Sequence, residues 1–91
     1  SKVCYNGIME KINYIVYKEK PGDETHEHDL VEVFRSDSFD RAKQFMSGIT
    51  ENLYARIDKV RSTYTPPPAG RIYKEERFGW SDEFIETVEE N

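Results

Sequence analysis

Metal-competent side chains gather in one segment, residues 23–29, which reads Asp-Glu-Thr-His-Glu-His-Asp. In an extended chain Glu24, His26 and His28 project to the same side, where they could offer two imidazoles and a carboxylate to a divalent transition metal. The chain has no further histidine, and its single cysteine, Cys4, is distant in sequence. Water or a second chain would have to complete the ligand set. We therefore expect a solvated acidic loop that holds no metal, and no cofactor elsewhere.

Nucleophilic side chains are present, but the sequence gives none of them an activating neighbour. Ser36, Ser38, Ser47 and Cys4 lie outside any Gly-x-Ser-x-Gly elbow, and there is no phosphate-binding Gly-Lys-Ser/Thr loop or His-Glu-x-x-His helix. Carboxylates are numerous, but general acid catalysis requires one of them to be desolvated in a cleft, and these fall in polar stretches. The sequence predicts a protein that is not an enzyme.

Basic and aromatic residues alternate in the second half of the chain. On a sheet, such side chains can stack and track single-stranded nucleic acid. Asp58, Glu75 and Glu76 dilute this patch, and ion pairs between neighbouring strands would use the same residues without a ligand. Nucleic-acid binding is therefore the alternative function. Its candidate residues are Arg56, Lys59, Arg61, Arg71, Lys74, Arg77, Tyr54 and Tyr73.

The acidic C-terminus has the clearest pattern. At 100° per residue its five acids fall on one side of a helical wheel, and Phe84, Ile85 and Val88 fall on the other. Ser81 is a suitable N-cap, so the pattern predicts a short acidic helix. Acids one turn apart along it would be spaced on the scale of DNA phosphates. The predicted partner-binding residues combine this helix with the acidic loop: Asp82, Glu83, Glu86, Glu89, Glu90, Asp23, Glu24 and Glu27.

Length and charge limit the class of protein. The chain has 91 residues, 13 basic against 18 acidic side chains, and 36% hydrophobic residues. This predicts a single small domain over residues 1–91, with a thin core that dimerisation would supplement. Residues 81–91 carry five acids and no base, so the remaining chain is neutral. Net negative charge disfavours binding to a phosphate backbone and favours a basic partner.

The elements that would position these residues begin with two strands. Residues 8–17 are rich in β-branched and aromatic side chains and predict a strand, and residues 30–34 predict a second one, paired antiparallel with the first. Asn6-Gly7 is a turn dipeptide, so residues 2–5 form either a short preceding strand or an ordered tail.

A helix follows from Phe39, because Ser38 can cap its first amides and apolar residues recur at helical spacing up to Ile49. It either continues to about Ser62 or ends near Gly48. We prefer the second, because glycine is a poor interior residue and a good terminator. Residues 53–61 then form a third strand, residues 66–70 a stiff proline loop, and residues 71–78 a fourth strand.

The predicted fold is α+β: a small antiparallel sheet of two β-hairpins in ββαββ order, one central helix packed on a face, and a short acidic C-terminal helix. No apolar run is long enough to span a bilayer and no hydrophobic signal segment opens the chain, which predicts a cytoplasmic protein. We expect a macromolecule-binding protein that acts through an acidic surface and forms a homodimer. Its most concrete version is a DNA-mimic inhibitor of a host nuclease or DNA-binding protein, as a viral or mobile-element accessory protein would be.

Overall fold

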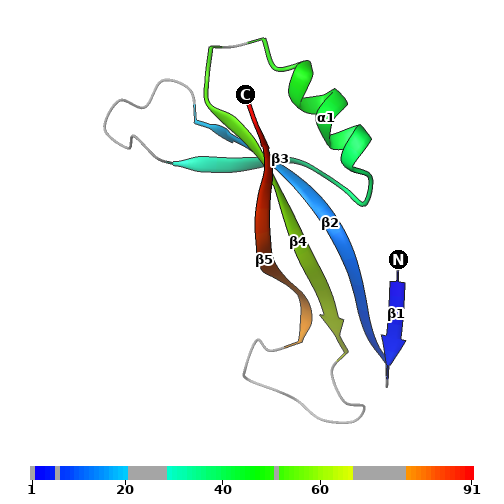
Figure 1. Cartoon of the computed structure of the whole chain (residues 1–91). Helices are drawn as coiled ribbons and strands as arrows, with labels where there is room; N and C mark the ends of the chain where they lie inside the picture. The colour runs from blue at the N-terminus through cyan, green and yellow to red at the C-terminus, as the bar shows by residue number, and fades with distance from the viewer. Residues whose placement is uncertain (1, 6, 21–28, 51, 67–77) are drawn as a thin grey trace.

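A computed structural model of the chain describes residues 2–5, 7–20, 29–50, 52–66 and 78–91, which form five strands and one helix (Figure 1). An α+β fold with an antiparallel sheet is therefore confirmed. The order of elements differs from the predicted ββαββ, because the described residues place three strands before the helix and two after it. Their bounds are β1 Lys2–Tyr5, β2 Ile8–Glu19, β3 Leu30–Ser36, α1 Phe39–Ser47, β4 Ala55–Thr65 and β5 Gly79–Glu90.

The central strand of the sheet is β2, as its run of β-branched and aromatic residues requires. One of its edges pairs with β4 over residues 9–18. Its other edge is shared, with β1 beside residues 8–11 and β3 beside residues 14–19. All pairings are antiparallel, and β5 extends the sheet beyond β4. Residues 2–5 pair with β2, so they are a strand and not a tail. Gly7, with φ of 80°, takes the left-handed conformation of the turn between β1 and β2.

The helix α1 begins and ends where the sequence predicts. The Arg41 backbone N–H donates to Ser38 Oγ at 3.2 Å, which makes Ser38 the N-cap. At the other end the Gly48 N–H donates to the carbonyl of Phe45 at 3.0 Å. The chain then turns back into β4, so residues 55–65 are strand. The alternative of one helix reaching Ser62 is wrong.

The apolar core lies between α1 and one face of the sheet. Val16 of β2 and Ile57 of β4 are register partners, and both are buried together with Ala42 of the helix. Partly buried side chains surround these three: Tyr14, Val33, Phe34, Phe39, Met46, Ile49 and Val88. In Figure 1 the helix covers only the end of the sheet that contains β3. We call this side of the sheet the helix face.

The predicted C-terminal helix is wrong: the acidic C-terminal residues form the strand β5. It pairs with β4 from Gly79 to Glu90, with register shifts opposite Ile57/Asp58 and Lys59/Val60. Ladder hydrogen bonds with β4 therefore take the place of intrahelical ones. Val88 still packs against the core, as the prediction of a docked apolar side required, but it does so from a strand.

The molecule is long for its size. Its radius of gyration is 16.1 Å and its extents are 50 × 31 × 18 Å, whereas a compact chain of this length has a radius of gyration of about 12 Å. The reason is visible in Figure 1: β2, β4 and β5 run on past the helix toward β1. The helix face and the opposite face of the sheet must therefore be stabilised differently.

Candidate functional site

The candidate site lies on the sheet face opposite α1, which we call the open face. Its members follow from the register, because paired residues on neighbouring strands share a face. Rows across β2, β4 and β5 are Tyr17/Arg56/Glu90, Ile15/Asp58/Thr87, Asn13/Val60/Phe84, Lys11/Ser62/Asp82 and Met9/Tyr64/Trp80.

A hydrogen-bond network built on the buried side chains of Asn13, Ser62 and Asp58 runs through the middle of the open face. Asn13 Nδ2 donates to Ser62 Oγ at 2.9 Å, and Ser62 Oγ donates in turn to Asp82 Oδ1 at 2.6 Å. Beside it, the buried Asp58 carboxylate accepts from Thr87 Oγ1 at 2.7 Å and from Arg56 Nε at 3.2 Å. Within the described ranges every buried side-chain nitrogen and oxygen has a partner. The network therefore fixes how β2, β4 and β5 are aligned.

Arg35 also belongs to this network, although it lies on β3, at the opposite edge of the sheet from β5. Its Nη1 and Nη2 donate to the Asp82 carboxylate at 3.0 and 2.7 Å, and its Nε and Nη2 donate to Glu32 at 3.1 and 2.9 Å. These bonds, to Asp82 first and then to Glu32, raise the pKa of Arg35. The hydrogen bond from Arg35 also holds the pKa of Asp82 below its usual value.

The reach of Arg35 shows that the sheet coils. β2 and β4 lie between β3 and β5. In a flat sheet, β3 and β5 would therefore be about 14 Å apart. Asp82 is also displaced along the strands, because Arg35 is in register with Asp58 whereas Asp82 is in register with Ser62. That offset adds about 13 Å along the strand direction. Contact at 2.7 Å therefore requires β5 to curl over the open face toward β3.

A hollow of about 620 Å³ lies on the coiled open face, lined by Tyr17, Asp29, Leu30, Arg56, Asp58, Val60, Asp82 and Phe84. Three carboxylates and one guanidinium give this lining a negative balance. Burial, followed by the charges of Glu32 and Asp58, raises the pKa of Tyr17. Because the hydrogen bond from Arg35 lowers the pKa of Asp82, this side chain is held as a carboxylate and is unsuited to donate a proton. The hollow offers negative charge and two aromatic rings to a ligand.

The acids of β5 do not form the single face that the helical wheel predicted. Asp82 and Glu90 lie on the open face, whereas Glu83 and Glu86 are in register with helix-face residues. Glu83 pairs with Arg61 at 2.9 Å. Glu90 accepts a hydrogen bond from the Tyr54 hydroxyl at 2.6 Å, which raises the pKa of Tyr54. All five acids, Glu89 included, are solvent-exposed. The acidic-loop residues Asp23, Glu24 and Glu27 lie outside the described residues.

Of the alternative nucleic-acid residues that the structure describes, Tyr54 and Arg56 interact with each other, whereas Lys59 and Arg61 lie on the opposite face from Arg56. Arg56 lies on the open face, where it binds Asp58. Lys59 and Arg61 lie on the helix face, and Arg61 is held between Glu10 at 3.4 Å and Glu83. These are the cross-strand ion pairs that explain basic residues without a ligand. The remaining candidates of the fourth predicted strand lie outside the described residues: Arg71, Tyr73, Lys74 and Arg77.

Two large apolar side chains of β5 are exposed on the open face. Trp80 is 51% and Phe84 is 60% exposed. Trp80 packs against Tyr64, with ring centroids 5.4 Å apart, and the Lys11 ammonium lies 5.2 Å from its ring. Sequence reasoning assigned Phe84 to the docked side of a helix and so missed this surface. On this face Trp80 and Phe84 flank Asp82, so the strand presents two exposed aromatic rings on either side of a carboxylate.

The serines considered as nucleophiles have structural roles instead. Ser36 Oγ accepts a hydrogen bond from the Ser38 N–H at 3.0 Å, and Ser47 Oγ donates to the Gln44 carbonyl at 2.8 Å. His26 and His28 lie outside the described residues. Across the described ranges, no three His, Cys, Asp or Glu side chains are grouped to hold a metal. The same residues include no helix with the length and apolar character to cross a membrane.

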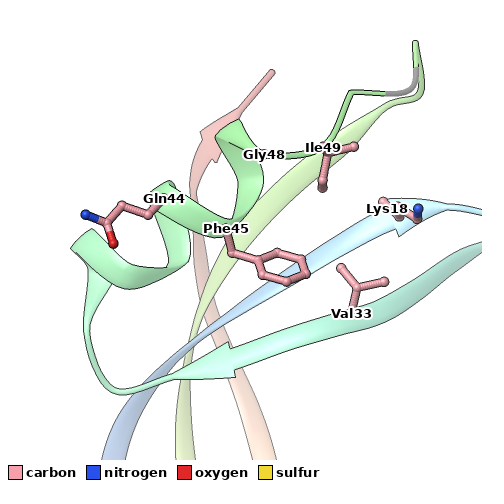
Figure 2. Close-up of a pocket in the computed structure, with 6 residues that line it drawn as sticks. All are labelled: Lys18, Val33, Gln44, Phe45, Gly48 and Ile49. Carbon is pink, nitrogen blue, oxygen red and sulfur yellow. The ribbon is translucent and has the colours of Figure 1, made fainter.

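A second hollow, of about 490 Å³, borders the core between α1 and the sheet (Figure 2). Phe45 projects from the helix toward Val33 of β3, and its ring stacks on Phe34 with centroids 4.6 Å apart. Lys18, Gln44, Gly48 and Ile49 complete the lining. This groove is the margin of the helix face.

No family model matches the chain, and the searches of curated proteins and of solved structures also find no match. Inference about function therefore starts from the open face and β5.

Proposed function

We propose that this protein is a non-enzymatic binding protein that holds a basic protein partner against β5. The observation that carries the proposal is the make-up of this one strand. It is the last strand of the sheet, its five acids are exposed, and it presents the aromatic side chains Trp80 and Phe84.

Charge and aromatic surface have separate parts in this function. Residues 81–91 contain five acids and no base, so the negative potential is concentrated at β5 and the adjoining hollow. Such a field steers a cationic partner and rejects an anionic one. Exposed aromatic side chains then provide the apolar anchors that account for most binding energy at protein interfaces.

A DNA-binding protein or nuclease is the specific basic partner that we propose, because its groove accepts closely spaced negative charges. The five acids of β5 are divided between two faces, but all lie along one strand. The protein would then act as an inhibitor that competes with DNA. A second copy of the chain is a poor partner for β5, because it would bring the same acids together. Homodimerisation remains a prediction and would use another surface.

Titration with a basic peptide as long as β5 tests the acidic surface. The chain has one tryptophan, Trp80, so its fluorescence reports on this strand directly. Changing Glu86→Gln with Glu89→Gln should weaken binding about tenfold, since each exposed charge contributes about 0.2–1 kcal/mol.

The matched control is Asp37→Asn with Asp40→Asn, which removes the same charge from the region where α1 begins. We expect it to leave the affinity near that of the unchanged protein. Equal losses in the two variants would show that only net charge matters and would contradict the proposal.

A further inference from the structure

Among the described residues no strand is hydrogen-bonded to the outer edge of β5, although the Arg35 side chain of β3 reaches Asp82 across the open face. The strand spans 12 residues and pairs with β4 along its whole length. Its other side meets no strand in the described ranges. In an antiparallel pair, alternate residues direct their N–H and C=O groups away from the partner, so this edge presents a row of donors and acceptors that pair with no strand in the part of the chain that the structure describes.

Only the first half of β5 is a regular template. From Gly79 to Phe84 the register with β4 is continuous, and both register shifts come after it. Within this half, Trp80, Asp82 and Phe84 lie on the open face and alternate with Ser81 and Glu83. A strand added here would also cover the two exposed aromatic side chains, whose burial favours binding.

The charges of β5 decide what can occupy this edge. If a second β5 paired with it antiparallel, acids from Asp82 to Glu90 would lie opposite or diagonal to the same acids, and like charges in such pairs are destabilising. The register shifts and the acids are also devices that keep a strand edge from pairing with its own copies. Self-pairing is thus disfavoured, whereas a cationic strand meets complementary charge.

We infer that β5 binds an extended segment of a basic protein by strand addition, with Lys or Arg beside Glu83 and Glu86 and apolar residues beside Trp80 and Phe84. This inference rests on the proposed function. Asp82 is bound by Arg35 and Ser62 and its side chain is only 32% exposed, so it requires no cation from the partner. Glu83 is paired with Arg61, but its side chain is 70% exposed and can accept a second cation. The added backbone hydrogen bonds give affinity and the alternating side chains give selectivity.

The test compares two peptides of equal charge, read by Trp80 fluorescence. The first alternates lysine with valine, and the second carries proline in place of the valines. Proline has no backbone N–H and cannot form a ladder. We expect the valine peptide to bind at least about tenfold more tightly, because several hydrogen bonds depend on that ladder.

The outcomes separate the two proposals. Equal binding of both peptides would overturn strand addition and leave the acidic surface as the binding site. Binding of neither peptide would overturn both. A higher affinity for the valine peptide supports both.

A pair of protein variants locates the site. Phe84→Ala removes an exposed aromatic side chain of β5 and should reduce the affinity for the valine peptide about three- to tenfold. Phe45→Ala is the matched control, since Phe45 is 40% exposed on α1 and stacks on Phe34 of β3, on the helix face. Equal affinity of the Phe84 variant and the unchanged protein would place the peptide elsewhere and overturn the inference.

Discussion

The two faces of one sheet are stabilised by different interactions. On the helix face Val16, Ile57 and Ala42 form an apolar core. On the open face the buried residues include Asn13 and Ser62, which are polar and hydrogen-bonded to each other. The helix supplies a second layer to the first face. On the open face, coiling of the sheet and the ion pair between Arg35 and Asp82 partly replace such a layer.

The two kinds of interaction also have different effects: one mainly stabilises the fold, and the other mainly fixes the register of the strands. Apolar packing is not directional and scales with buried area. Hydrogen bonds require matched donors and acceptors, so a one-residue slip of β5 would break the chain of contacts from Asn13 through Ser62 to Asp82. We expect the helix face to hold the fold together and the open face to hold β5 in the register that presents Trp80 and Phe84.

The largest effect should come from the helix face. Ile57→Ala removes a fully buried side chain from the core and should lower the free energy of unfolding by about 2–5 kcal/mol. Urea unfolding measures this. Val31→Ala is the control, because Val31 is exposed and its loss should cost less than about 0.5 kcal/mol. Similar losses in the two variants would show that the core is not beneath α1.

A smaller effect is expected from the open-face network. Ser62→Ala leaves Asn13 Nδ2 without its acceptor and Asp82 without one donor, and should cost about 1–3 kcal/mol. Adding Asn13→Leu to this variant should recover part of the loss, because both polar partners are then replaced. Urea unfolding of both variants checks this, and an unaltered midpoint for Ser62→Ala would contradict the network.

The smallest effect on the free energy of unfolding should appear only at acidic pH. Arg35 lowers the pKa of Asp82 in the folded state, so the fold favours the carboxylate. This contribution is complete above the unfolded pKa of about 3.9 and is lost as the pH falls through the lower folded value. Urea unfolding between about pH 5 and pH 2 should show a steeper loss for the unchanged protein than for Arg35→Ala. Parallel pH profiles would contradict the bridge.

Much of the fold could be predicted from local patterns. β2, β3 and α1 have strong signals: β-branched and aromatic residues of one parity in β2, a short run of apolar and β-branched residues in β3, and a capping serine before a periodic apolar stripe in the helix. β4 followed once Gly48 was taken as the helix end. These elements agree with their intrinsic preferences, so tertiary contacts had little to override.

β5 could not be predicted as a strand, because its irregular register with β4 gives its apolar residues a spacing that also fits a helix. Two register shifts interrupt the two-residue alternation, which leaves apolar residues at Phe84, Ile85 and Val88, a spacing that also fits a helical wheel. The β-favouring residues Phe84, Ile85, Thr87 and Val88 were the contrary signal. Pairing with β4 is a long-range contact and decided the outcome.

The open-face site also could not be predicted from the sequence, with the exception of one residue. Asn13 interrupts an apolar strand on the same side as Ile15, and a polar residue at such a position needs a buried partner. That partner, Ser62, and the bridge from Arg35 to Asp82 depend on strand order and coiling, which local patterns do not contain.

Hydrogen exchange of the β5 amides, followed by NMR with and without the alternating lysine–valine peptide, tests the central claim most directly. In the free protein we predict protection of the amides that bond to β4 and fast exchange of the alternate amides on the outer edge between Gly79 and Phe84. The peptide should protect the second set and leave α1 unchanged. Fast exchange of the outer-edge amides at saturating peptide would contradict strand addition at β5.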